Sequence, residues 1–361
     1  MKNTFGNAIS LTIFGESHGS HIGAVLDGIA PGIKIDYDYI NACLDLRKPH
    51  GTISTTRREG DNFQIISGVF NGYSTGTPLT LIIPNTSTKS CDYDKIKDTP
   101  RPGHADYTAE CKYHGFQDYR GGGHFSGRVT AALVASGAIL KKALEEKGVF
   151  IGTHISYLGG VHDEKIKTLD DAKALSNKYF PALSDSAEKE MKNKIENAAQ
   201  KGDSIGGILE SCVFGVPAGV GEPFFDSMES MLSHILFSIP GIKGVEFGAG
   251  FGFADLLGSS ANDPFTVDSG KIITETNNNG GINGGISNGM PIVFRCAVKP
   301  TPSIYIEQKT VNISKKQSTD ITVEGRHDPA IIHRARAVVD AAAAIAIADM
   351  LTMQYGTDYL K

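Results

Sequence analysis

The segment from Arg101 to Arg128 gathers residue types that could bind an anion and move a proton. It reads RPGHADYTAECKYHGFQDYRGGGHFSGR, with few apolar side chains and three successive glycines at 121 to 123. Arginine offers a planar fork of donors for a carboxylate or phosphate, and histidine exchanges a proton near neutral pH. Glycines let a ligand approach the backbone closely. The segment therefore predicts a functional loop around a small anionic ligand, with an ordinary solvated surface loop as the alternative.

Other short motifs, many of them rich in glycine, follow one another along the whole chain. They are FGESHG (14–19), RREGD (57–61), GDSIGG (202–207), GVPAGVGEP (215–223), KGVEFGAGF (243–251), GGINGGISNG (280–289), KPTPSI (299–304) and GRHDP (325–329). With the 101–128 segment, these motifs resemble the chorismate synthase family, in that family's order. The resemblance implies a lyase that converts 5-enolpyruvylshikimate 3-phosphate to chorismate and phosphate in the shikimate pathway. It further implies a redox-neutral 1,4-elimination that requires reduced FMN.

The resemblance also implies three catalytic residues. His18, in GESHG, matches the group that protonates the leaving phosphate, and His104, in RPGHAD, matches the group that protonates the reduced flavin. Asp328, in GRHDP, matches the carboxylate that assists the flavin N5 in removing hydrogen. The alternative for Asp328 is an N-cap on a helix that begins near Pro329, because aspartate at that position accepts a free backbone N–H.

Two sets of binding residues follow from the same resemblance. The substrate carries two carboxylates and a phosphate, so its site must supply several cations, although each basic residue could instead be a surface charge of little consequence to stability. The implied substrate-binding residues are Ser17, Arg47, Lys48, Arg57, Arg101 and Arg128. The implied flavin-binding residues are Arg47, His124, Phe125, Ser126, Pro240, Gly241, Gly284, Lys299, Pro300, Thr301, Pro302, Ser303 and Arg326.

His124 and Phe125 depart from the family pattern, because many relatives have arginine and serine there. The exchange removes a cation and a hydroxyl from the implied flavin edge.

Composition narrows the classes of function and location. A formal net charge of −5 argues against non-specific nucleic-acid binding. Five widely spaced cysteines without a CxxC pair predict neither a disulfide framework nor a metal site, and favour a cytoplasmic protein. We expect no membrane span, because the alanine-rich stretch from Ala335 to Met350 is short and carries Asp340 and Asp349.

Strand and helix patterns do not alternate as βαβ units, which favours an α+β fold. The resemblance implies a single-domain β-α-β sandwich over residues 1–361, with the site on loops above the sheets, assembled as a homotetramer. Strands are predicted at 11–14, 22–26, 64–70, 79–83, 151–158, 208–214 and 292–298, with 304–307 as a hairpin partner or extension of the last. Helices are predicted from Asp36 or Asp38 to near Pro49, over 129–146 and 184–201, after a capping box of Asp226 and Glu229, and over 335–353.

Three other classes of protein are alternatives to this interpretation. A Rossmann fingerprint is missing, because GAGFGF at 248–253 lacks the third glycine, and no P-loop exists. The alternative from another class is a non-catalytic flavin- or phosphate-binding protein on the same scaffold. The sequence leaves open whether the chain reduces its flavin with NADPH or depends on a separate flavin reductase.

Overall fold

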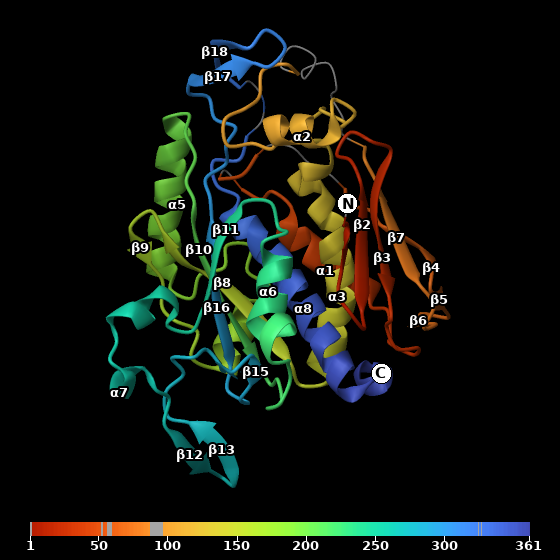
Figure 1. Ribbon diagram of the computed structural model, residues 1–361, viewed down its shortest axis with the longest axis vertical. Helices are drawn as coiled ribbons and strands as arrows, with labels where there is room; N and C mark the ends of the chain where they lie inside the picture. Colours follow the sequence, from red (N-terminus) through yellow and green to blue (C-terminus); the bar gives the residue numbers. More distant parts are fainter. Residues whose placement is uncertain (1, 52, 56–59, 87–96, 324, 326) are drawn as a thin grey trace.

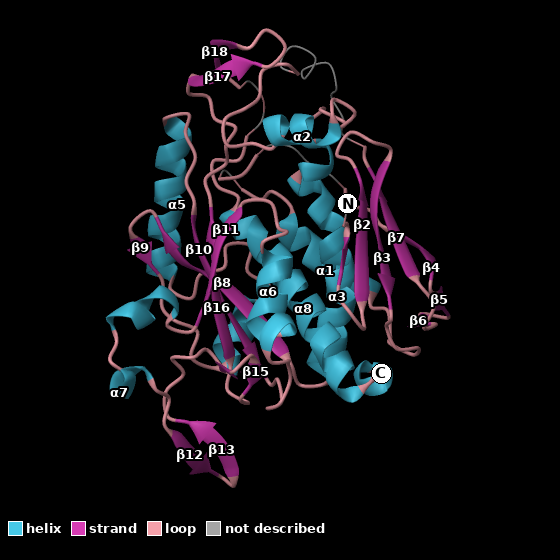
Figure 2. Cartoon of the chain, viewed as in Figure 1, coloured by secondary structure: helices cyan, strands magenta, loops and turns pink. Residues whose placement is uncertain are grey.

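Two antiparallel sheets enclose a layer of helices (Figures 1 and 2). The structure is a computed structural model that describes residues 2–51, 53–55, 60–86, 97–323, 325 and 327–361. The first sheet has the strand order β1 (Thr4–Phe5), β2 (Ser10–Gly15), β3 (His21–Asp27), β7 (Leu79–Pro84) and β4 (Gln64–Ser67). The second has the order β11 (Ile242–Phe247), β16 (Ile292–Val298), β10 (Gly207–Phe214), β8 (Phe150–Leu158) and β9 (Val161–His162). This arrangement confirms the predicted α+β sandwich.

The central layer consists of α1 (Tyr37–Arg47), α3 (Thr130–Glu146), α6 (Met228–Leu236) and α8 (Ile332–Tyr355). The helices α4 (Leu169–Leu175) and α5 (Asp185–Gln200) lie on the outer side of the second sheet. The remaining elements are short: α2 (Asp106–Tyr113), α7 (Gly258–Ala261), β5 (Val69–Phe70), β6 (Tyr73–Ser74), β12 (Phe265–Asp268), β13 (Lys271–Thr274), β14 (Ile282–Asn283), β15 (Ile286–Ser287), β17 (Gln308–Asn312), β18 (Gln317–Ile321) and 3₁₀ turns at 123–125, 127–129, 224–226, 250–255 and 357–360.

The helix α8 is the centre of the core. It is long and apolar enough to cross a membrane, but 89% of its most apolar window is buried inside the protein. Its small residues let the neighbouring helix come close, since a Cβ added at Gly137 of α3 would lie 2.6 Å from the Cβ of Ala341. The alanine-rich helix α8 therefore packs closely against α3, and it is a core helix rather than a membrane span.

Asp349 of α8 ties the N-terminal segment to the core. Its carboxylate accepts the backbone N–H groups of Asn7 at 3.0 Å and of Ala8 and Ile9 at 2.8 Å, and the residue has no exposed surface. We expect Asp349→Ala to lower the free energy of unfolding by about 2–5 kcal/mol, because it leaves buried donors without partners. Urea unfolding measures this, with the exposed Asp38→Asn as the control. A loss smaller than about 0.5 kcal/mol would contradict the contact.

Most predicted elements are present with small shifts of their ends. The α1 helix follows Asp36, whose side chain accepts the N–H of Tyr39 at 3.0 Å, and α5 follows Ser184, which caps it in the same way. The predicted strands from 11–14 through 292–298 and the helices over 129–146 and 335–353 also correspond to observed elements, except that the strand predicted at 64–70 is divided at Gly68 into β4 and β5, which belong to different sheets.

Four sequence-based expectations differ from the structure. The cap of α6 is Ser227 and not Asp226, because a serine hydroxyl accepts the N–H of Ser230 there. Residues 304–307 form no strand, and the hairpin that follows pairs β17 with β18. The polar 101–128 segment contains the short surface helix α2. The α8 helix begins at Ile332 after Ile331, so Asp328 is not its N-cap.

Candidate active site

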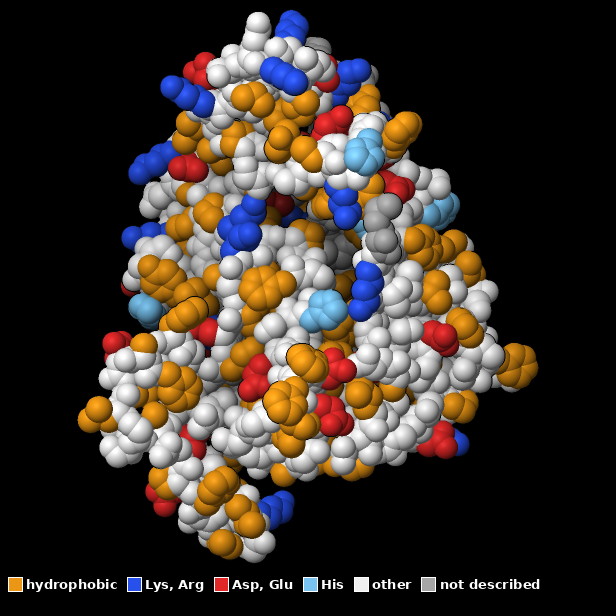
Figure 3. All heavy atoms as spheres, in the orientation of Figure 1, with side chains coloured by type: hydrophobic (Ala, Val, Ile, Leu, Met, Phe, Trp, Pro, Cys, Tyr) orange, Lys and Arg blue, Asp and Glu red, His pale blue; other side chains and the backbone are white. Residues whose placement is uncertain are grey.

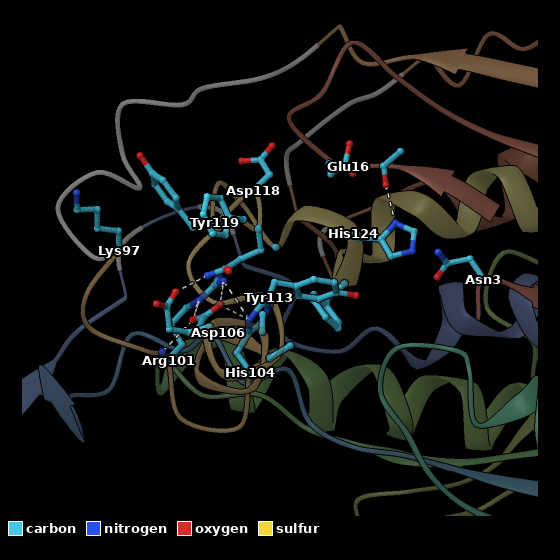
Figure 4. Close-up of a pocket in the computed structure, with 18 of the residues that line it drawn as sticks. Asn3, Glu16, Lys97, Arg101, His104, Asp106, Tyr113, Asp118, Tyr119 and His124 are labelled. Carbon is cyan, nitrogen blue, oxygen red and sulfur yellow. Dashed lines mark hydrogen bonds and ion pairs between the residues drawn. The ribbon is translucent and has the colours of Figure 1, made fainter. Parts of the chain in front are cut away.

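The 101–128 segment lies at one end of the sandwich, where α2 covers the top of the central helices in Figure 1. A cavity of about 340 Å³ opens beside it, between the segment and the end of β2. Residues predicted from the sequence line one wall, among them Arg101, His104, His124 and Phe125 (Figure 4). The β17–β18 hairpin packs on the same end, because Thr310 donates to the carbonyl oxygen of Pro100 at 2.6 Å.

His18 sits in the turn after β2 and is 8% exposed. Its Nδ1 lies 3.2 Å from the hydroxyl of Ser17, which donates to the carbonyl oxygen of Arg120 at 3.3 Å. A hydroxyl has one proton to donate, and a carbonyl only accepts, so Ser17 must accept the Nδ1–H of His18. The Nε2 of His18 is then the ring atom that can exchange a proton with a ligand.

Gly121 fixes the place of His18. A Cβ at this position would lie 2.4 Å from Cε1 and 2.6 Å from Nδ1 of the His18 ring, and the φ angle of +69° disfavours any other residue. We expect Gly121→Ala to lower turnover at least about tenfold by displacing the ring, since small misplacements are costly at reacting groups. Gly148→Ala, at an open turn of similar φ, is the control for backbone strain in both turnover and melting temperature. Equal turnover in the two variants would show that the His18 position does not matter.

Arg101, His104 and Asp106 form a connected group at the start of α2 (Figure 4). Asp106 accepts from Nε and Nη2 of Arg101, each at 2.8 Å, and its Oδ1 lies 2.6 Å from Nδ1 of His104. Arg101 Nη2 also donates to the carbonyl oxygen of Gly121 at 3.0 Å. Burial opposes the charge of Asp106, but the hydrogen bonds from Arg101 and His104 outweigh it and hold its pKa below the ordinary value. Arg101 therefore joins two parts of the segment.

Arg47 and Arg128 share one buried carboxylate. Asp61, 3% exposed, accepts from Nη2 of Arg47 at 2.8 Å and from Nη1 of Arg128. Burial opposes the charge on Asp61, but the two guanidinium groups outweigh it and keep the Asp61 pKa low. The other two guanidinium nitrogens of Arg128 donate to the side-chain oxygen of Asn85 and to the carbonyl oxygen of Pro84. The structure therefore brings Arg47 and Arg128 together, and all three guanidinium nitrogens of Arg128 donate to protein groups.

Asp328 is linked to Arg47 through Arg334. Its carboxylate accepts the backbone N–H of Thr55 at 2.8 Å and pairs with Nη1 of Arg334. Arg334 Nε in turn donates to the carbonyl oxygen of Arg47 at 2.8 Å. Burial is the main cause that lowers the pKa of Arg334, while the charge of Asp328 opposes it. Asp328 is thus held in place by two donors from different parts of the chain.

The predicted flavin-binding residues of the second half of the chain lie in two separate places. Lys299 Nζ donates to the carbonyl oxygen of Gly103, and the backbone N–H of Lys299 donates to Gly241, so the 299–303 and 240–241 stretches adjoin the segment that holds His104. The intervening Pro300, Thr301, Pro302 and Ser303 continue the first stretch, in which Ser303 is buried. Gly284 is separate, because it lies in an exposed turn between β14 and β15, away from α2 in Figure 1. Arg57 and Arg326 lie outside the described residues.

His124 and Phe125 occupy the wall of the cavity. His124 Nδ1 donates to the carbonyl oxygen of Gly15 at 2.8 Å, which joins the segment to the end of β2 (Figure 4). The ring of Phe125 packs edge-on against Tyr113, with centroids 6.1 Å apart. Ser126 is the cap of the next turn and accepts the N–H of Arg128 at 3.2 Å. Lys48 is farther out and pairs with Asp45 at 3.4 Å.

Three residues of this site received no role from the sequence. Asp61 and Asp106 stand inside RREGD and RPGHAD, so their place in a motif was the available signal. Arg334 follows GRHDP by five residues and had no signal, because its contact with the carbonyl oxygen of Arg47 joins distant parts of the chain. Within the described ranges, no group of three or more His, Cys, Asp or Glu residues is placed to hold a metal ion.

Buried guanidinium groups, two histidines and bare glycine backbone beside a cavity define an enzyme that acts on a small anionic molecule. Comparisons with known proteins specify the family. The chorismate synthase family model matches residues 9–352. A chorismate synthase of Pyrococcus abyssi is 46% identical over 346 residues, with 96% of each chain covered. One of Dehalococcoides mccartyi is 45% identical over 351 residues, covering 97% of this chain and 96% of that protein.

A solved crystal structure of a chorismate synthase agrees with a TM-score of 0.76 at 28% sequence identity, covering 98% of this chain and 94% of that chain. The chain therefore belongs to the chorismate synthase family. It is a lyase that converts 5-enolpyruvylshikimate 3-phosphate to chorismate in the shikimate pathway. As a family these enzymes use reduced FMN.

Proposed function

We propose that the chain performs this conversion as a redox-neutral 1,4-elimination that requires reduced FMN. The observation that carries the proposal is the position of two histidines at adjacent glycines. The ring of His18 packs on Gly121, and a Cβ at Gly122 would lie 3.5 Å from Cε1 of His104. Two histidines that can exchange protons, 86 residues apart in the sequence, thus lie beside the same pair of glycines. Such a pair suits a reaction in which a leaving group and a cofactor each need a proton.

The residues present fit a flavin phosphate. Arg47 Nε and Thr301 Oγ1 are buried and have no hydrogen-bond partner among the described residues, and both belong to the predicted flavin set. Such orphaned donors are explained by a bound group that accepts from them. Lys299 adds a charge beside Gly103. Arg47, Lys299 and the 299–303 backbone would hold the cofactor, which when bound supplies electron density for the departure of phosphate and is returned unchanged.

His18 is the proposed acid for the leaving phosphate. Its Nδ1–H is held by Ser17, so the proton that it delivers comes from Nε2. The neighbouring Asp118 is kept charged: partial burial opposes this, but hydrogen bonds from Arg120 and, to a smaller extent, the His18 charge lower its pKa.

Asp328 is the proposed carboxylate that assists hydrogen removal. The N–H of Thr55 and the guanidinium of Arg334 fix its two oxygens. The arginines bound to Asp61 supply positive potential for the phosphate and carboxylates of the substrate. Lys48 and Arg57 remain proposed substrate contacts.

Anaerobic phosphate release tests the function. The purified chain should release phosphate from 5-enolpyruvylshikimate 3-phosphate with reduced FMN, and not with oxidised FMN or without flavin. A chain that binds both molecules but releases no phosphate in any condition would instead be a non-catalytic flavin- or phosphate-binding protein.

The assembly proposed is a homotetramer of single-domain chains. Its support is apolar surface on the hairpin β12–β13 at the bottom of Figure 3, where Phe265, Val267 and Ile272 are 68%, 70% and 72% exposed. Monomers rarely leave such patches uncovered. Light scattering should give four times the mass of the chain.

A cytoplasmic location is proposed on the free thiols of Cys43, Cys111, Cys212 and Cys296. NADPH or a separate flavin reductase supplies the reduced cofactor. NADPH-dependent flavin reduction by the purified chain alone distinguishes the two.

A further inference from the structure

The carboxylate of Asp106 connects the proposed proton donor His104 with Arg101. One oxygen, Oδ1, lies 2.6 Å from Nδ1 of His104 and 2.8 Å from Nη2 of Arg101. The other, Oδ2, accepts from Nε and from the backbone N–H of Arg101, at 2.8 Å and 2.9 Å. Figure 4 shows the three side chains together at the wall of the cavity. Both oxygens of Asp106 are therefore fully used.

This arrangement decides which ring nitrogen of His104 carries the fixed proton. Arg101 Nη2 also lies 3.1 Å from Nδ1, so Nδ1 could in principle accept from it. A guanidinium beside it keeps Asp106 ionised, and an ionised carboxylate only accepts. The 2.6 Å contact then requires a proton on Nδ1, which excludes Nδ1 as the acceptor for Arg101. His104 is held with Nδ1–H toward Asp106.

The remaining ring nitrogen is the one that can meet a ligand. His104 lines the cavity, and Gly122 packs beside its Cε1, where a Cβ would lie 3.5 Å away. With Nδ1 engaged, only Nε2 can exchange a proton with a bound molecule. Because Arg101 shares the charge of Asp106, the carboxylate orients the imidazole while binding its proton less strongly than an unpaired carboxylate would.

We propose that Asp106 is a positioning residue that fixes His104 in the Nδ1–H tautomer, directs Nε2 to the bound cofactor or substrate, and sets Arg101 against the glycine run. The inference rests on the proposed function, since it assumes that His104 handles a proton in the reaction. Asp106 itself touches neither substrate nor reacting atoms in this assignment. Its effect on turnover therefore passes through His104 and, for the loop geometry, through Arg101.

A double-mutant cycle tests the proposal. Asp106→Asn should lower turnover roughly 10–100-fold, the usual effect of removing a group that orients a reactive histidine, with a smaller change in KM. In the His104→Gln background the same change should have a much smaller effect, because the route through His104 is already gone and only the contact with Arg101 remains. Asp38→Asn is the matched control, as Asp38 is the exposed acidic residue in the first turn of α1. Equal losses in both backgrounds would overturn the proposal.

A measurement on the parent protein makes the test independent of folding and of activity. The ¹⁵N resonances of the His104 ring, assigned with His104→Gln, report which nitrogen is protonated. Above the pH at which the doubly protonated ring loses one proton, we expect the remaining proton on Nδ1. A neutral ring with its proton on Nε2 would overturn the proposal. If the parent released no phosphate at all, the proposed function would fail while the tautomer result would still stand.

Discussion

Replacing His18 by alanine is expected to lower turnover by roughly 10²–10⁴-fold, the usual contribution of a general acid. Packing of the hydrophobic core does not explain a histidine at this position. The ring lies in a turn, where it is hydrogen-bonded to Ser17 and packs against Gly121. Affinity for the substrate should fall much less, because the guanidinium groups held by Asp61 supply the charge that attracts it. Single-turnover phosphate release, together with substrate titration, separates the two effects.

The matched control is His21→Ala, three residues along the same chain segment and exposed at the start of β3. It should leave turnover within about twofold of the parent, as surface changes usually do. Near-normal turnover in His18→Ala would assign His18 to structure. Binding lost as strongly as turnover would assign it to substrate recognition instead.

Replacing Asp328 by asparagine is expected to lower turnover by at least about 10²-fold, the lower end for acid–base groups. Asparagine keeps an oxygen for the N–H of Thr55 but carries no charge and accepts no proton. FMN and substrate should still bind, because removal of a negative charge does not weaken a site for anions. Phosphate release and equilibrium titration of both ligands measure the difference.

Because Asp328 forms an ion pair with Arg334, the Asp328→Asn variant should also be less stable than the parent. The interpretation of Asp328 as a helix cap did not include this effect. Asp328→Asn leaves the largely buried guanidinium of Arg334 without its counter-charge, which should lower the free energy of unfolding by about 1–3 kcal/mol. Asp320→Asn on the exposed face of β18 is the control for a lost surface charge. An asparagine variant that turns over normally would show that Asp328 only holds Arg334 and Thr55 in place.

The elements of the sandwich could be predicted from the sequence because their signals are local. An N-cap at Asp36 or Ser184, or the buried alternation of β16, depends on neighbours within a few positions. The Asp226 cap was wrong because Ser227, the next residue, offers the same kind of acceptor one position closer to α6. Local rules name a cap but do not choose between adjacent candidates.

The sequence predicted which residues belong to the candidate site but not which of them contact one another. Motif resemblance singled out Arg47, Arg101 and Arg128, yet it assigned all three to the substrate, and Arg47 to the flavin as well. The structure shows Asp61 between two of them and Asp106 on the third, pairings that depend on how distant segments meet. The contact of Arg334 with the carbonyl oxygen of Arg47 likewise forms only when α8 docks beside α1. The flavin role of Gly284 stays a prediction.

The most direct test of the central claim is the count of flavin oxidised for each phosphate released. The proposed reaction requires reduced FMN but consumes none, because substrate and product stand at the same oxidation level. Under strict exclusion of oxygen, with reduced FMN at a concentration far below that of the substrate, one would follow the flavin absorbance and the released phosphate together. Many phosphates released for each FMN, with the flavin still reduced at the end, is the predicted result. One FMN oxidised for each phosphate would contradict a redox-neutral elimination.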